Sequence, residues 1–289
     1  MRPRLAYVTN PDSAHEDFDG PVLIEALDRA RMDVVVQDWD VPAAWADFDA
    51  VLVGCAWGST ARRQEFLRWA RTVDEETLLA NPLRSLVRST DRTYLRDLAS
   101  HGFPCVPMLW FEPGDDAAIL AEEVAATGWA SLRVEPNTVT ADARAVEADS
   151  VDTAVSAAAD LLEAGCIVSV EGRPADEPER AQTAVVLVGG RAAYGFTHGD
   201  QATGARLITV DDDLAQLATR VVAYDSAGEE PVCARVDLVR GTDGWLLQDY
   251  NTCGPELMLQ AHPAAAEDLA WAVKARIMPD ERRSASLGR

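Results

Sequence analysis

The chain has 289 residues, of which 48% are hydrophobic, and a formal net charge of −22. This length exceeds one typical domain and predicts two or three packed units. The negative charge argues against nucleic acid or an anionic membrane as a partner, because both are themselves negatively charged. No apolar run approaches the roughly 20 residues that span a bilayer, and no signal-peptide core opens the chain, so we expect a cytoplasmic protein.

Strands and helices alternate over the first third of the chain. Short apolar strands are predicted at 5–9, 33–37 and 48–54, with amphipathic helices over 20–32 and 61–73 between and after them. This alternation is typical of a parallel sheet, which usually meets its ligand at the carboxyl ends of its strands. The candidate pocket residues at those ends are Asn10 and the stretch 55–59; within it, Trp57 is more simply interpreted as a core residue. No G-x-G-x-x-G follows the first strand, which argues against a dinucleotide site.

The rest of the chain is more varied. Asn81-Pro82 interrupts the alternation and indicates a domain boundary. The predicted elements beyond it are helices over 91–100, 115–127, 150–164, 212–226 and 263–276, strands over 105–111, 130–136 and 166–170, and hairpins over 181–196 and 234–251. The five cysteines are scattered without a C-x-x-C pair, so neither a disulfide framework nor a zinc site is indicated. Cys253 is expected to be a packing residue.

The late hairpin, residues 234–251, carries the strongest chemical signal. If residues 242–244 form a three-residue loop with Gly244 in the left-handed position, Asp237 lies opposite Asp249. Arg235 then lies opposite Asn251, and all four side chains share one face. Opposed like charges destabilise a sheet, so this arrangement predicts a cation between the carboxylates, and hard oxygen ligands suit Mg²⁺. Two alternatives stay open: a two-residue loop would turn Asp249 to the other face, and the polar residues could simply face solvent.

The order of these elements resembles the ATP-grasp superfamily, in its branch with glutathione synthetase and the ribosomal-protein-S6-modifying enzymes. Within that branch it is most similar to cyclo-ligases of the D-cycloserine type. The similarity extends roughly from the first strand to Leu259. The segments that carry it are Asn81-Pro82-Leu83, Asp91-Arg92-Thr93-Tyr94-Leu95, Leu132-Arg133-Val134-Glu135-Pro136, Ala234-Arg235-Val236-Asp237 and Asp249-Tyr250-Asn251.

The resemblance implies an α/β (α+β) fold in which an N-terminal parallel-sheet domain precedes a two-lobed ATP-grasp unit. We expect the N-terminal, pre-ATP-grasp domain over 1–88, the small lobe over 89–165 and the large lobe with the metal-binding hairpin over 166–278. Residues 279–289 are expected to form a frayed tail.

The resemblance also implies a set of site residues. Asp237, Asp249 and Asn251 take the places of the ligands of Mg²⁺, and Arg235 that of a catalytic, phosphate-facing arginine. Arg92 and Arg133 stand where the family usually has lysines that contact the phosphates of ATP, so with Arg235 they are the expected nucleotide-binding residues.

Several positions depart from the family pattern. Arginine matches the charge of lysine at positions 92 and 133 but not its shape. Residues 137–142 contain no glycine, although a glycine-rich loop usually covers the phosphates there. Gln182 replaces a frequent acid, and Asp249 stands where glutamate is usual.

Some of these residues have simpler interpretations. Arg92 could pair with Asp91 or Asp97 on its own helix. Arg133 lies on an apolar strand, where a buried charge must be paired, and this favours a phosphate contact. His198 is either solvated or a pocket residue suited to proton transfer.

The expected activity is that of an ATP-dependent ligase. It would join or cyclise a carboxylate-type or amino-acid-like small molecule with an amine-type nucleophile through an acyl phosphate, with ATP and Mg²⁺. A homodimer is the default expectation for the oligomeric state. The alternative is a degenerate ATP-grasp protein that binds a ligand or partner without turnover. A metal-dependent hydrolase or sugar-nucleotide enzyme ranks lower, because the sequence lacks a matching histidine cluster.

Overall fold

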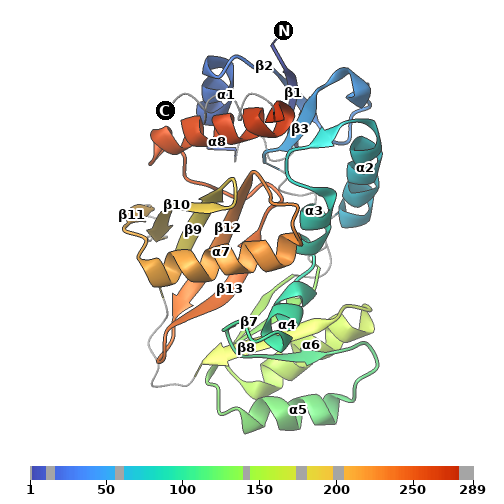
Figure 1. The fold of residues 1–289 in the computed structure, drawn as a ribbon. Helices are drawn as coiled ribbons and strands as arrows, with labels where there is room; N and C mark the ends of the chain where they lie inside the picture. The colour runs from blue at the N-terminus through green and yellow to red at the C-terminus, as the bar shows by residue number, and fades with distance from the viewer. Residues whose placement is uncertain are drawn as a thin grey trace.

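Three sheets lie one below another in the computed structural model (Figure 1), which describes residues 2–10, 17–55, 62–138, 144–173, 181–197 and 205–279. The first sheet belongs to the N-terminal part of the chain, the five-stranded sheet lies in the middle, and the third sheet lies at the far end. The predicted mixed α/β architecture is confirmed.

The first sheet is parallel, as predicted, and has the strand order β2-β1-β3-β4. Its elements in chain order are β1 (Arg4–Thr9), α1 (Gly20–Arg29), β2 (Asp33–Asp38), the 3-10 turn η2 (Trp45–Asp47), β3 (Ala50–Val53), α2 (Arg63–Glu76) and β4 (Leu78–Leu79). The central strands β1 and β3 are apolar and almost entirely buried, because helices cover a parallel sheet on both faces.

Two short helices, α3 (Leu83–Ser89) and α4 (Thr93–Ser100), lead from the first sheet to the third. The third sheet is antiparallel, with the order β5-β8-β6-β7, and α5 and α6 pack on it. Its elements are β5 (Met108–Phe111), α5 (Ala117–Ala126), β6 (Ser131–Pro136), β7 (Val146–Ala148), α6 (Val151–Glu163) and β8 (Val168–Arg173).

The pairing of β8 bears on the boundary between the two lobes. β8 pairs with β5 on one side and β6 on the other, although the predicted division after residue 165 would assign it to the large lobe. A strand hydrogen-bonded on both edges belongs to the sheet that surrounds it. We therefore propose that the small lobe extends to Arg173.

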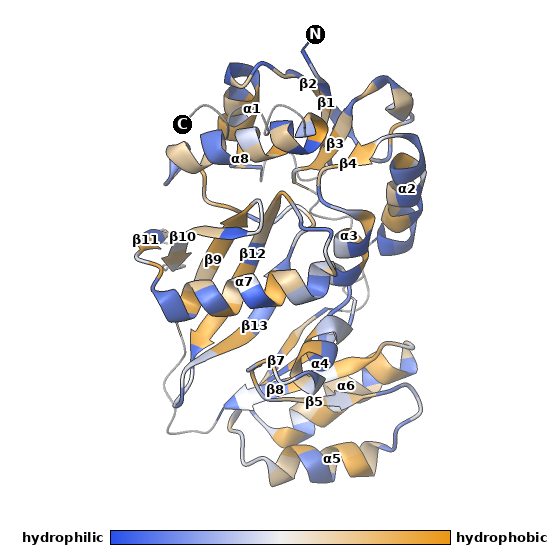
Figure 2. Ribbon diagram, viewed as in Figure 1, coloured by the Kyte–Doolittle hydropathy of each residue, from blue (hydrophilic) through white to orange (hydrophobic). Residues whose placement is uncertain are grey.

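The middle sheet is antiparallel and has the order β11-β10-β9-β12-β13. Its elements are β9 (Gln182–Val188), β10 (Arg191–Thr197), β11 (Arg206–Ile208), α7 (Asp212–Ser226), β12 (Cys233–Arg240) and β13 (Trp245–Asn251). The hydropathy colouring shows hydrophobic residues along β9 and β12 (Figure 2), which occupy the centre of the sheet.

Both faces of the middle sheet are buried, and alternate residues of β9 point to different cores. Val185 and Leu187 pack under α7, whereas Ala184 and Val186 belong to the core shared with α8. On β12, the even-numbered residues Ala234 and Val236 face α7. Successive side chains of a strand point to opposite faces, so the odd-numbered Arg235 and Asp237 point away from α7.

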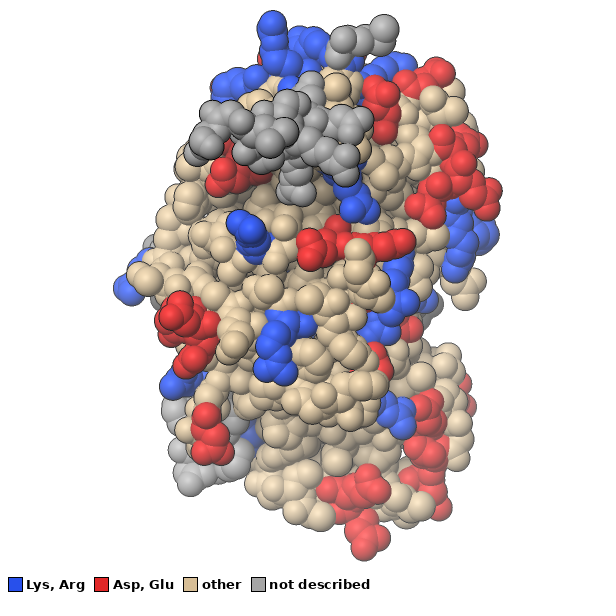
Figure 3. Space-filling view, viewed as in Figure 1, with Lys and Arg blue, Asp and Glu red and all other residues tan. Residues whose placement is uncertain are grey.

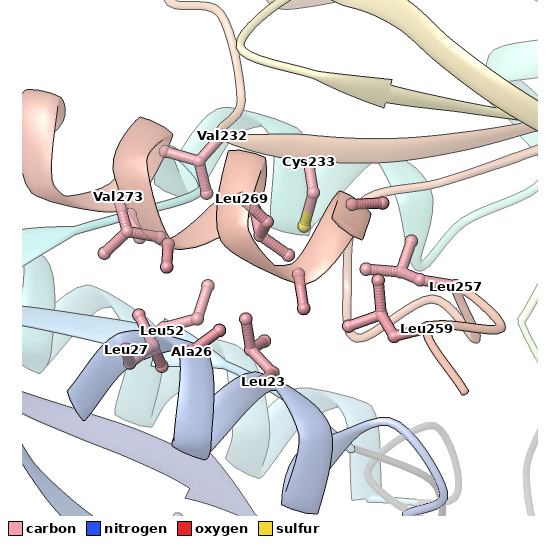
Figure 4. Close-up of a cluster of buried hydrophobic side chains, with 14 of the residues drawn as sticks. Leu23, Ala26, Leu27, Leu52, Val232, Cys233, Leu257, Leu259, Leu269 and Val273 are labelled. Atoms are coloured by element: carbon pink, nitrogen blue, oxygen red, sulfur yellow. The ribbon is translucent and has the colours of Figure 1, made fainter. Parts of the chain in front are cut away.

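The last helix, α8 (Pro263–Ile277), shares one hydrophobic core with α1 and the first sheet. Figure 4 shows Leu23, Ala26 and Leu27 of α1 facing Leu269 and Val273 of α8. One continuous core therefore joins the first sheet and α1 to α8 and the middle sheet.

The surface drawn in Figure 3 carries acidic and basic side chains interspersed with each other. The described helices are all too short or too polar to traverse a bilayer.

Candidate active site

The late hairpin places the predicted residues opposite each other. Asp237 pairs with Asp249 and Arg235 with Asn251 across β12 and β13, so this predicted register is confirmed. The geometry behind it differs from the prediction. Arg240 pairs with Trp245, which leaves a four-residue loop, and a β-bulge at Gln248 restores the register.

The predicted conformation of Gly244 is also wrong. Its φ of 153° is positive but far from the left-handed helical value near 57°. A four-residue loop does not require the left-handed glycine of a three-residue loop. The bulge, which the sequence did not reveal, is what brings Asp249 opposite Asp237.

Asp237 is buried and only half satisfied. Its side chain is 1% exposed, and its Oδ2 accepts hydrogen bonds from Arg235 Nε at 3.1 Å and Nη2 at 3.0 Å. Its Oδ1 is buried and has no hydrogen-bond partner among the described residues. Burial, together with the nearby Asp249 and against the pull of Arg235, raises the pKa of Asp237 to about 6. A carboxylate in this state is stabilised by a bound cation.

Asp249 is held by a tyrosine from another element. The hydroxyl of Tyr94, on α4, donates to Asp249 Oδ1, and the backbone N–H of Tyr250 donates to the same Tyr94 hydroxyl at 2.7 Å. Burial, and then the charge of Asp249, raises the pKa of Tyr94 well above its ordinary value, so the phenol stays protonated.

Asn251 and Arg235 connect the hairpin to the segment that follows it. Asn251 Oδ1 accepts a hydrogen bond from the backbone N–H of Cys253 at 2.8 Å, which leaves its second lone pair for a ligand. Arg235 Nη1 donates to the carbonyl of Glu256 at 3.2 Å. Burial raises the pKa of the Cys253 thiol to about 12, which fits a packing role.

Two of the three predicted nucleotide-binding arginines, Arg92 and Arg133, meet in a cleft of about 440 Å³ between the third and middle sheets. Arg92, Arg133 and Asp249 are among its lining residues, whereas Arg235, Asp237 and Asn251 are not. The cleft is also lined by the polar side chains of Glu135, Glu147, Glu171, Gln182 and Gln248. The structure therefore divides the predicted site residues between the cleft and the adjoining face of the hairpin.

The two predicted cleft arginines, Arg92 and Arg133, are ion-paired. Arg92 Nη2 lies 2.7 Å from Glu135 Oε2, and its Nη1 lies 4.0 Å from Asp249 Oδ1. Burial alone would lower the pKa of Arg92, but the carboxylates of Asp249 and Glu135 outweigh it, and the pKa is raised. These partners lie on β13 and β6, so the alternative that Arg92 pairs within its own helix is wrong.

Arg133 is not a buried unpaired charge. It is 41% exposed, pairs with Glu135 at 2.7 Å, and forms a second ion pair with Glu147. An unpaired buried charge therefore cannot be used to argue that Arg133 contacts phosphate. Arg133 remains a candidate phosphate-binding residue because it lines the cleft.

A second cavity, of about 500 Å³, lies at the carboxyl ends of β1 and β3. It is lined by Tyr7, Cys55 and the apolar residues around them, and by the carboxylates of Asp17, Asp19 and Glu256. The expectation that a pocket forms at these strand ends is confirmed, with Cys55 in its wall. Asn10 is buried but does not line it. Residues 56–59, 139–142 and His198 lie outside the described residues.

Comparison with known proteins gives the same family along nearly the whole chain. Residues 5–81 match the family described as D-cycloserine synthetase DcsG, N-terminal domain. The cycloserine biosynthesis protein DcsG of Streptomyces lavendulae is 29% identical, over 95% of this chain and 99% of that protein. The crystal structure of D-cycloserine synthetase DcsG superposes with a TM-score of 0.84 at 28% identity, over 95% of this chain and 99% of that one.

The chain is thus similar to D-cycloserine synthetase along nearly its whole length, and its fold is that of the ATP-grasp ligases. More distant structures share the fold: the D-alanine–D-alanine ligase of Bacillus anthracis complexed with ATP has a TM-score of 0.69 at 15% identity, covering 98% of this chain and 99% of that one. A RimK domain ATP-grasp protein of Sphaerobacter thermophilus has a TM-score of 0.70 at 18% identity, covering 95% and 99%.

The donor set of this ATP-grasp ligase fits Mg²⁺. Two carboxylates oppose each other, one of them with a buried oxygen that lacks a partner, and an amide oxygen lies on the next residue of the same face. Within the described ranges, no group of three or more His, Cys, Asp or Glu side chains is arranged to hold a metal. A site here would thus consist of two carboxylates and one amide, with the remaining oxygens supplied by water or phosphate.

Sequence reasoning did not single out several residues that line or contact the candidate site. Tyr94 lies on the apolar face of α4, where its spacing resembles that of a core residue. Asp17, Asp19 and Glu256 belong to connecting segments without a periodic pattern. Their role depends on pairings between distant segments: Asp19 accepts the backbone N–H of Leu257 at 2.6 Å, across more than 200 residues.

Proposed function

We propose that the chain uses ATP and Mg²⁺ to activate the carboxylate of a small amino-acid-like substrate and to join or cyclise it with an amine-type nucleophile. The observation that carries this proposal is the pair Asp237 and Asp249, opposed on one sheet face beside an arginine-lined cleft. A structural relative was solved as a complex with ATP, and other relatives bear the name D-cycloserine synthetase.

The reaction would proceed in two balanced steps. A carboxylate oxygen of the substrate attacks the γ-phosphorus of ATP, the bond to the bridging oxygen breaks, and ADP leaves with that bonding pair. The amine nitrogen then attacks the acyl carbon of the acyl phosphate, inorganic phosphate leaves, and the nitrogen loses its proton to solvent. Such phosphoryl transfer depends on positioning and charge neutralisation more than on acid–base groups.

The residues divide this work between the cleft and the second cavity. Arg92 and Arg133 would bind phosphate oxygens in the cleft. Arg235 contacts both Asp237 and the Glu256 carbonyl at the wall of the second cavity, so it would meet the charge of the transferred phosphoryl group. Asp237, Asp249 and Asn251 would hold Mg²⁺, which neutralises phosphate charge when bound.

The lining of the second cavity favours an ammonium-bearing substrate. Its described wall is largely apolar and contains three carboxylates, from Asp17, Asp19 and Glu256, with no arginine or lysine. A site of this charge attracts a cationic group and repels a second carboxylate. An amino acid derivative could place its ammonium group among these acids and its reacting carboxyl group toward Arg235.

The test replaces Asp237 by Asn and measures ATP-dependent hydroxamate formation from a panel of small D- and L-amino acids, with hydroxylamine as the trapping nucleophile. The wild type is expected to form hydroxamate from at least one amino acid. The variant should lose more than about 100-fold in rate, since even residues that only support a metal ligand contribute roughly 10–100-fold. An unchanged rate in Asp237→Asn would contradict the assigned metal site.

The second candidate is a degenerate ATP-grasp protein that binds without turnover. The observation in its favour is that Arg92 and Arg133 are already paired with Glu135, and Arg133 also with Glu147. A thermal-shift experiment separates the two candidates, because a ligand at 100 times its Kd stabilises a protein by about 2.7 kcal/mol. No shift with ATP or ADP, with or without Mg²⁺, would favour the degenerate protein.

A further inference from the structure

We propose that Tyr94 is a positioning residue for Asp249, whose carboxylate it holds in the orientation that binds the metal. This inference rests on the proposed function, because it assigns Tyr94 a task within that metal site. It goes beyond the ligand set itself, since Tyr94 lies on a different element and would not touch the metal.

The contacts of Tyr94 connect two segments that are distant in the sequence. Its side chain is buried in the first turn of α4, its hydroxyl donates to Asp249 Oδ1, and the backbone N–H of Tyr250 donates to the hydroxyl. An ionised carboxylate only accepts hydrogen bonds, so the direction of the Tyr94–Asp249 bond is defined. The Tyr250 N–H also donates to Asp249 Oδ1, at 2.9 Å, so the phenol, this backbone N–H and the carboxylate form one hydrogen-bonded group.

Asp249 needs such support because of its place in the sheet. β13 is the last strand of its sheet, so the outward N–H of Tyr250 meets no further strand. Asp249 also follows the bulge at Gln248, where the ladder is interrupted. Asp237, in contrast, lies on β12 with a strand on each side and is held by Arg235. Each carboxylate thus has a partner of its own.

The same turn of the chain also reaches the small lobe. Arg92, two residues before Tyr94, pairs with Glu135 on β6. The beginning of α4 therefore contacts the metal carboxylate through Tyr94 and the cleft through Arg92. Removal of the Tyr94 hydroxyl should loosen Asp249 without removing the charge that Arg92 supplies.

The test measures Mn²⁺ binding to Tyr94→Phe in the presence of ADP, by electron paramagnetic resonance of free Mn²⁺. The substitution keeps the ring and removes only the hydroxyl. The Kd for Mn²⁺ is expected to rise about 10–100-fold, the usual effect of losing a hydrogen-bond partner of a metal ligand. The matched control is Tyr250→Phe, because the buried hydroxyl of Tyr250 has no partner among the described residues; its Kd should change less than about twofold.

A double-mutant cycle gives the second measurement. If Tyr94 acts through Asp249, Tyr94→Phe should have little effect in a protein that already carries Asp249→Asn. In that background it should raise the Kd for Mn²⁺ by less than about twofold. An equal loss in both backgrounds, an unchanged Kd in Tyr94→Phe, or an equal loss in the Tyr250→Phe control would each overturn the inference. Wild-type protein that binds no Mn²⁺ with ADP would instead contradict the proposed function, and this inference with it.

Discussion

Arginine occupies both cleft positions at which the family resemblance implies lysine, and both arginines bind carboxylates. Arg92 is 19% exposed and lies between Glu135 and Asp249, so it links the third sheet to the hairpin of β12 and β13. A guanidinium can bridge two acceptors in this way, whereas an ammonium group acts as a single point charge. A nucleotide phosphate would compete with Glu135 for the same guanidinium.

Two replacements of Arg92 show whether ADP affinity depends on the charge of this side chain or on its shape. Arg92→Ala should lower ADP affinity by about 100-fold or more, because it removes a positive charge from a site that must accept phosphate and leaves only Arg133 beside Glu135. Arg92→Lys keeps the charge and should retain affinity within about tenfold. Isothermal titration with Mg²⁺ and ADP measures both effects.

The matched control for these variants is Arg96→Ala. Arg96 lies on the same helix but is 52% exposed, and its ion pair among the described residues is with the exposed Glu112. Exposed ion pairs contribute about 0–1 kcal/mol, so this variant should bind ADP normally. Equal affinities in Arg92→Ala and Arg96→Ala would remove Arg92 from the nucleotide site.

The bulge in β13 is the element that assembles the candidate metal site. Leu238 pairs with Leu247, and the residue before Leu238, Asp237, pairs with Asp249. Gln248 is therefore the additional residue. Leu247 is also fixed on its other edge, where its N–H donates to the Pro104 carbonyl at 2.7 Å and its carbonyl accepts the Val106 N–H at 2.8 Å. The additional residue lies next to this fixed point, and Gln248 lines the cleft.

Deletion of Gln248 tests this description of the hairpin. Without the additional residue, Asp249 would directly follow Leu247 and still pair with Asp237 in a regular ladder. We therefore expect the deletion variant to bind Mn²⁺ in the presence of ADP within about tenfold of the wild type, whereas Asp249→Ala should lose binding. Equal loss in both variants would show that the bulge itself, and not only the pairing, is required.

Patterns that repeat locally were enough to predict the elements. The apolar run within 48–54 and the helical periodicity over 61–73 correspond to β3 and α2, because a strand buried on both faces is apolar throughout and a helix buried on one face is apolar every three to four residues. The register of the hairpin was predicted correctly, although the predicted loop was one residue too short and the compensating bulge was absent from the prediction.

Other features depend on pairings that a single sequence does not encode in a recognisable pattern. The residue pattern of the strand at 168–173 is compatible with either antiparallel sheet, so its place between β5 and β6 could not be inferred. Tyr94 has the spacing of a core residue, and only the three-dimensional fold brings its hydroxyl to Asp249. The roles assigned to Arg92, Arg133, Arg235, Asp237, Asp249 and Asn251 stay predictions.

At the scale of the whole molecule, Asn81 joins the N-terminal domain to the hairpin. Its Nδ2 donates to the carbonyls of Cys233 at 3.0 Å and Thr252 at 2.6 Å, and its Oδ1 accepts the Cys233 N–H at 3.2 Å. The side chain is 2% exposed. These bonds fix the beginning of β12 and the segment after β13 relative to the first sheet, and so define the wall of the second cavity.

Asn81→Ala should lower the free energy of unfolding by about 3 kcal/mol, because it leaves buried backbone groups without partners. Urea denaturation followed by circular dichroism measures this change. The control is Gln260→Ala, which removes one exposed hydrogen bond to the Phe18 carbonyl and should cost less than about 0.5 kcal/mol. Similar losses in the two variants would contradict the joining role of Asn81.

The contact between α1 and α8 has a consequence for biosynthesis of the protein. Leu23 and Leu27 are made long before Leu269 and Val273, which cover them. At typical translation rates, the roughly 180 residues between β4 and α8 take about 10–40 s to synthesise. During that interval the apolar face of α1 lacks its covering helix, so an apolar surface stays uncovered on the nascent chain until α8 has been made.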